Sequence, residues 1–139
     1  MNHRELVAAV EECTLAAADF HHGDHVRLGW IYLEELPLIE ALRRFSTTLK
    51  RFAAHHGAVD KYHETITWAY LLLIHERMRG PRGGDWESFR ADNADLFAWK
   101  PSILDRYYTP GLLGSREARR TFVLPDRLAA GRIRPAPSR

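Results

Sequence analysis

The sequence has a single cysteine and no long hydrophobic run. Cys13 has no second cysteine to pair with inside the chain, so an internal disulfide is excluded and a reducing compartment is expected. The longest uninterrupted apolar run, Trp68 to Ile74, covers seven residues. A helix that spans a membrane needs about 20. The chain also does not open with a basic region followed by an apolar one. We therefore expect a protein of the cytoplasm with no membrane partner.

Short motifs that would indicate a chemistry are also missing. The sequence contains no His-Glu-x-x-His, no pair of cysteines and no Asp-rich calcium loop. The glycine-rich stretch at 80–84 does not end in Lys-Ser/Thr and follows a helical pattern, so it is not a phosphate-binding loop. Function must therefore be argued from how the residues are distributed.

The share of charged residues, 27%, is ordinary, but basic and acidic residues are unevenly distributed along the chain. Residues 114–139 carry seven arginines and two acidic residues, whereas residues 1–113 carry 13 basic and 16 acidic ones. A length of 139 residues with 45% hydrophobic content suits one domain with its own core. Helical periodicity is lost from Pro125 onward. We predict a single helical domain over 1–124 and a flexible, disordered basic tail over 125–139.

Apolar residues recur at steps of three and four, which is typical of amphipathic helices. The pattern predicts a first helix that reaches Phe20, and further helices over about 24–35, 38–56 and 61–78. The centre of the last of these, Trp68 to Ile74, is apolar on every side, as in the buried middle of a bundle. No stretch alternates like a strand. We predict an all-α fold: an up-and-down four-helix bundle core with short additional C-terminal helices.

Histidine is the residue type with the most uneven distribution. Six of the eight histidines fall within a stretch of 43 residues. In an up-and-down bundle, helix ends that are joined by short loops lie at the same end of the bundle. The predicted helices place every cluster at such an end, so we expect the clusters to meet. The clusters are His21, His22 and His25, then His55 and His56, then His63 beside Glu64.

This arrangement predicts a site for one divalent transition metal, zinc or iron. Both ions favour imidazole and carboxylate ligands from facing helices. The ion would act as a Lewis acid or activate bound water or dioxygen. Glu64 is the catalytic candidate, as a general base or as a fourth ligand. The metal-ligand candidates are His22, His25, His56 and His63.

A purely structural role for the same residues stays open. Histidines near a helix C-terminus and a glutamate in a first turn both interact favourably with the helix dipole. Pro37 decides the geometry of the metal site. If Pro37 opens a separate helix, His25 and His56 lie at one end of the bundle. If it kinks one helix over 24–56, they lie roughly 45 Å apart and cannot share an ion.

Three functions are consistent with these observations. The first is a metal-binding protein or metal-dependent enzyme, a hydrolase, lyase or oxidoreductase, acting on a small-molecule substrate. The second is a non-enzymatic interaction module whose Arg-rich C-terminal segment binds an acidic partner or nucleic acid. The acidic body and the lack of a clear helix-turn-helix disfavour nucleic acid. The third is a metal-free carrier of a small ligand, walled by C-terminal aromatic residues. The candidates for this aromatic wall are Trp86, Phe89, Phe97, Trp99, Tyr107 and Tyr108.

The sequence leaves the oligomeric state open, since both a monomer and a dimer are consistent with it.

Overall fold

The computed structural model describes residues 1–78 and 84–127, and all the regular elements in these two ranges are helical. They include no β-strand, only an isolated bridge between Trp99 and Ser102. The chain is therefore all-α, as the sequence predicts. The α-helices are α1 (His3–Glu11), α2 (His22–Glu35), α3 (Leu38–His55), α4 (Glu64–Met78), α5 (Trp86–Asp92), α6 (Ala94–Phe97), α7 (Pro110–Leu113) and α8 (Arg116–Arg120), and the short 3-10 helices are η1 (Ala17–Asp19), η2 (Val59–Lys61) and η3 (Ile103–Arg106).

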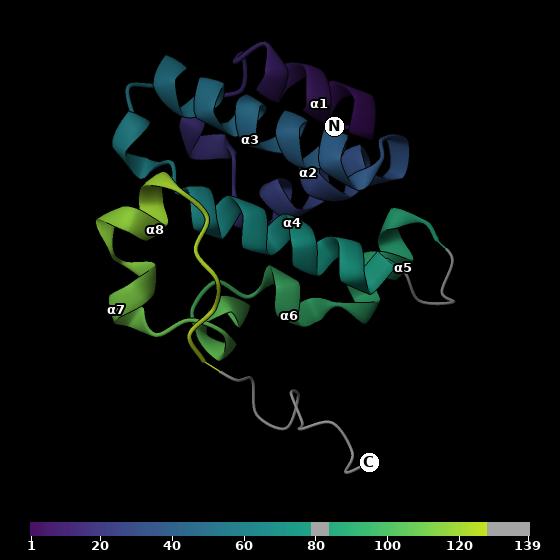
Figure 1. Ribbon diagram of the computed structural model, residues 1–139. Coiled ribbons are helices and arrows are strands. Elements are labelled where there is room, and N and C mark those ends of the chain that lie inside the picture. Colours follow the sequence, from purple (N-terminus) through teal and green to yellow (C-terminus); the bar gives the residue numbers. More distant parts are fainter. Residues whose placement is uncertain (79–83, 128–139) are drawn as a thin grey trace.

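Helix α4 lies in the middle of the molecule, between the N-terminal helices and the C-terminal half (Figure 1). It packs against α2 and α3 on one side and against α8 and η3 on the other. Its sequence has no polar face, and a helix of that kind is stable in water only when it is surrounded by other elements. Helix α1 packs against α2 and α3. The short C-terminal helices supply the remaining cover of α4.

The first helix ends earlier than its apolar pattern predicts. That pattern runs to Phe20, but α1 stops at Glu11. Cys13 adopts a left-handed backbone with a φ of 60°. The N–H of Cys13 donates to the carbonyl of Val10, and the N–H of Thr14 donates to that of Ala9. These two bonds form a Schellman motif, a common helix stop that normally uses glycine. The absence of glycine at position 13 conceals this stop in the sequence.

Pro37 separates two helices. Leu36 has an extended backbone, with φ of −130° and ψ of 150°, and Pro37 is the N-cap of α3. The residue before a proline is disfavoured in the helical region, which explains why α2 ends at Glu35. The chain therefore reverses between α2 and α3, and the two helices pack side by side. This geometry brings the start of α2 near the end of α3.

The C-terminal half is held to α4 and to itself by specific hydrogen bonds. The Thr65 hydroxyl donates to the carbonyl of Thr121 and accepts from the N–H of Val123. Further along, the N–H and hydroxyl of Thr109 both donate to the Asp126 carboxylate. These contacts extend the packed body to the last described residues. The rest of the predicted tail, 128–139, lies outside the described residues, as does most of the glycine-rich stretch, 79–83.

Within 1–78 and 84–127, no helix combines the length and apolar character that crossing a membrane requires.

Gly57 follows the end of α3 in the left-handed conformation, with a φ of 69°. Ala in that conformation costs about 1–2 kcal/mol, so Gly57→Ala should lower the free energy of unfolding by about that amount. Gly111→Ala is the matched control, because an added Cβ meets nothing within 4 Å at either position and only Gly57 has a positive φ. Urea denaturation of both variants checks this. An equal loss in the two would contradict the conformational explanation.

Candidate functional site

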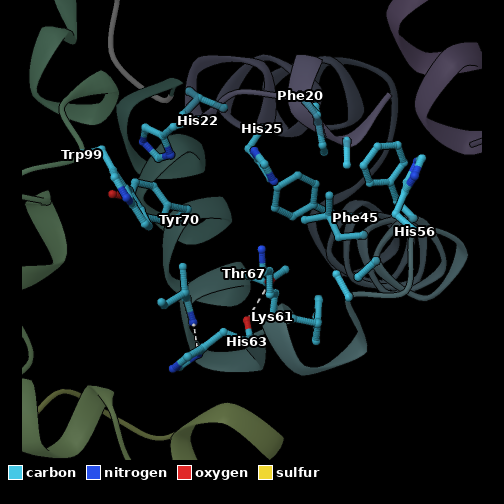
Figure 2. A pocket seen from close by; sticks show the side chains of 18 of the residues that line it. Phe20, His22, His25, Phe45, His56, Lys61, His63, Thr67, Tyr70 and Trp99 are labelled. Atoms are coloured by element: carbon cyan, nitrogen blue, oxygen red, sulfur yellow. Dashed lines mark hydrogen bonds between the residues drawn. The ribbon is translucent and has the colours of Figure 1, made fainter. Parts of the chain in front are cut away.

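A pocket of about 560 Å³ opens between α2, α3 and α4. This is within the size range of sites that bind small molecules. Its wall is mainly aliphatic and aromatic, with histidines, two tyrosines, one threonine and two cations (Figure 2). The lining residues are Ala17, Phe20, His22, His25, Val26, Phe45, Leu49, Phe52, Ala53, His56, Ala58, Lys61, Tyr62, His63, Ile66, Thr67, Tyr70, Trp99 and Arg119.

All four histidines that the sequence nominates as metal ligands line this one pocket. Figure 2 shows them around its periphery, with His22 and His56 on opposite sides and His63 at the end away from His25. Within the described ranges, no group of three or more His, Cys, Asp or Glu side chains is placed to hold a metal ion. The clusters do meet, but they surround a space instead of sharing one point.

His25 presents an unprotonated nitrogen to the pocket. Its Nδ1 lies 3.0 Å from the carbonyl oxygen of His21. A carbonyl only accepts, so Nδ1 carries the proton and Nε2 keeps its lone pair. The ring stacks on Phe20 with centroids 4.0 Å apart. Burial lowers the pKa of His25 to about 4, since the charged imidazolium loses its hydration there. The imidazole is therefore neutral at neutral pH, with Nε2 as a hydrogen-bond acceptor.

His63 is fully used by the fold. Its Nε2–H donates to the carbonyl of Leu113 at 2.7 Å, and its Nδ1 accepts from the N–H of Ile66 at 3.1 Å. The second bond caps the first turn of α4, because the N–H of Ile66 is among those that have no partner within the helix. Neither nitrogen is left for a ligand. His63 is thus the N-cap of α4, a role that its position in the sequence does not reveal.

His22 and His56 both have a nitrogen without a hydrogen-bond partner among the described residues. The Nε2–H of His22 donates to the carbonyl of Leu96 at 2.9 Å, and no described residue bonds its Nδ1. Burial lowers the pKa of His22 as well. His56 packs against Phe52, and its Nε2 is buried without a hydrogen-bond partner among the described residues.

The histidines near position 21 do not lie where the sequence predicts. The first predicted helix was expected to end at His21 and His22. In the structure His21 is the N-cap of α2, and His22 is its first residue. An imidazolium there would be disfavoured, because the N-terminus is the positive end of the helix dipole. The dipole explanation therefore does not hold for these two residues. It still fits His55, the last residue of α3.

Glu64, the predicted catalytic carboxylate, is not part of the pocket lining. Its Oε1 accepts a hydrogen bond from the Tyr62 hydroxyl at 2.7 Å and lies 3.6 Å from Nζ of Lys50. Tyr62 itself lines the pocket. Burial, reinforced by the Glu64 carboxylate, raises the pKa of Tyr62. Glu64 therefore lies outside the pocket lining and fixes the position of the Tyr62 side chain through this hydrogen bond.

Several lining residues were missed by reasoning from the sequence. Phe20 enters from the irregular segment between α1 and α2, and Tyr70 comes from the middle of α4. Trp99 and Tyr70 both pack against the ring of His22. Of the C-terminal aromatic residues proposed as a wall, Trp99 alone lines this pocket. No local pattern marks these positions, because only packing brings Phe20 to His25 and Tyr70 to His22.

The chain has no significant match among protein-family models, curated proteins or solved structures.

The low pKa of His25 makes stability depend on pH. Between pH 6.5 and 4, His25 binds a proton in the unfolded chain but stays neutral in the folded protein. The free energy of unfolding should therefore fall as the pH falls. The loss from His25 is on the order of 2–3 kcal/mol. The lowered pKa values of His22 and His63 act in the same direction.

Urea denaturation at several pH values checks this expectation. His25→Leu should flatten the pH dependence, while His55→Leu, at an exposed position, should keep it. An unchanged pH dependence in His25→Leu would show that His25 does not carry the effect.

Proposed function

We propose that this protein binds a small, largely apolar molecule that donates one hydrogen bond to Nε2 of His25. The observation that carries the proposal is a neutral imidazole directed into an apolar pocket, with an unprotonated nitrogen that no described residue bonds. A ligand site with a mostly hydrophobic wall and a few oriented polar groups has this composition. Phe20 and Phe45 lie beside His25 and offer flat surfaces to an apolar ligand (Figure 2).

Binding suits His25 better than proton abstraction does. A general base is most effective when its pKa lies near the working pH. The pKa of His25, about 4, is well below that range. Its stacking on Phe20 and its bond to the His21 carbonyl keep the acceptor at one position. A preorganised acceptor strengthens binding because no side-chain freedom is lost when the ligand arrives.

The test is fluorescence titration with N-phenyl-1-naphthylamine, a neutral aromatic probe with one N–H donor. We expect saturable binding by the wild type. His25→Leu should bind about threefold to tenfold more weakly, the equivalent of one buried hydrogen bond. The matched control His55→Leu removes an imidazole outside the pocket and should bind normally.

A second pair of variants tests the pocket itself. Ala53 on α3 lines the pocket, whereas its neighbour Ala54 is exposed and does not. Ala53→Trp should abolish binding by filling the space, and Ala54→Trp should leave it unchanged. Saturable binding that is equally strong in both would place the probe elsewhere and contradict the proposal.

Metal binding is the second candidate function, and the convergence of four histidines on one pocket is the observation that favours it. His25 and His22 each keep one unprotonated nitrogen. A zinc or iron site would need at least a third donor, and recruiting His63 would break its bonds to Leu113 and Ile66. Such a site would activate water or polarise a substrate as a metal-dependent enzyme does.

Elemental analysis of untagged protein, purified without chelator or nickel resin, tests the metal. Near-stoichiometric zinc or iron that is lost in His22→Ala/His25→Ala would establish the site. Less than about a tenth of an equivalent, with no uptake of added metal, would exclude it.

The interaction module has less support in the described residues. Arg119 is directed to the pocket and to nearby carbonyls, while Arg132, Arg134 and Arg139 lie outside the described residues. A location in the cytoplasm remains a prediction from the lone cysteine.

A further inference from the structure

The pocket wall contains cations and no carboxylate. Its ionisable residues are four histidines, two tyrosines, Lys61 and Arg119, with no aspartate or glutamate among them. The chain as a whole has 18 acidic residues. The acidic residues nearest to Lys61 in the sequence, Asp60 and Glu64, do not line the pocket. Glu64 is bonded to Tyr62 and paired with Lys50, and Asp60 is exposed and in no ion pair with another described residue.

The two cations lie at the same part of the pocket. Nη1 of Arg119 donates to the carbonyl of Asp60 at 2.8 Å and to that of Tyr62 at 3.5 Å. These two carbonyls flank Lys61 in the chain, so the guanidinium is held against the backbone that carries the ammonium group. Carbonyl oxygens are neutral and leave the charge of Arg119 uncompensated. That charge also reaches His63, whose lowered pKa has burial as its main cause and Arg119 as a further one.

Neither cation has an ionic partner within the described part of the chain. The ion pairs formed there involve other basic residues: Arg44, Lys50, Arg77, Arg106 and His21. Two positive charges beside an apolar pocket attract a ligand of opposite charge, and the low-dielectric wall strengthens that attraction relative to open water. A guanidinium also matches the two oxygens of a carboxylate geometrically.

We infer that the ligand is an amphipathic carboxylate, a fatty or aryl acid whose apolar body lies among the aromatic residues and carries the N–H or O–H group that donates to Nε2 of His25. Its carboxylate group contacts Lys61 and Arg119. This inference rests on the proposed function, because it names the class of molecule that the same pocket binds. The apolar wall excludes small polar anions, and the absence of acidic lining residues disfavours amines.

The experiment is a competition titration in which decanoate or methyl decanoate displaces N-phenyl-1-naphthylamine at submicellar concentration. Both compounds have the same acyl chain and neither has a hydrogen-bond donor for His25, and only decanoate is charged. In the wild type we expect decanoate to bind about fivefold to tenfold more tightly than methyl decanoate, the size of two exposed ionic contacts. Raising the salt concentration should reduce that ratio.

Variants assign the preference to the two cations. Lys61→Gln and Arg119→Gln should each lower the ratio of the two affinities, and the double variant should bring it close to one. Arg120→Gln is the control, because Arg120 is exposed on the same helix and does not line the pocket. A ratio within one variant is insensitive to a loss of folding that weakens both ligands equally. Lys61 is exposed, and its substitution should leave the fold intact.

Four outcomes would overturn the inference, and they differ in what they imply. Methyl decanoate that binds as tightly as decanoate to the wild type would refute a carboxylate ligand and leave the apolar pocket of the proposed function standing. Failure of both compounds to displace a bound probe would likewise refute the inference alone, whereas failure of the probe to bind would refute the proposed function as well. A preference for decanoate that survives in the double variant would remove Lys61 and Arg119 from the site.

Discussion

Helix α4 has no polar face, and the rest of the structure is arranged to keep it away from water. Leu71 and Ile74 are completely buried, and they pack where Gly29 allows α2 to approach closely. An added Cβ at Gly29 would lie 3.1 Å from Ile74 and 3.2 Å from Leu71. A larger residue on α2 would therefore require these two side chains to shift by a few tenths of an ångström. The C-terminal half is required for the same reason, since it covers the side of α4 that α2 and α3 leave open.

The pocket forms where this packing is incomplete. Near the start of α4, irregular segments lie at the ends of α2, α3 and α4. These segments contribute Phe20, Ala58 and Tyr62 to the pocket wall. Buried imidazoles in such a place must be neutral or paired. His63 is satisfied by two bonds, His22 and His25 by one each, and the pKa values of all three are lowered. The unbonded nitrogen of His25 is then available to a ligand, and the two cations lie at the same pocket.

The sequence was informative about elements and less so about the site. The periodicity of α3 predicted that helix, because the signal is local. The first helix was predicted too long, since the stop at Cys13 depends on a left-handed residue that is not glycine. The meeting of the histidine clusters followed from short connections between helices. Their chemistry did not, because the role of each imidazole depends on which carbonyl or N–H lies within hydrogen-bonding distance of it.

Local sequence was therefore sufficient for the all-α class, the buried character of α4 and the position of the histidines near helix ends. These properties depend on hydrophobic periodicity and on turn residues, which act over a few positions. The place of Trp99 and Arg119 in the pocket, the capping role of His63 and the position of Glu64 outside the pocket lining depend on contacts between residues distant in the chain. Only the packing of the helices determines such contacts, because a rotation of one helix about its axis would exchange the side chains that face the pocket.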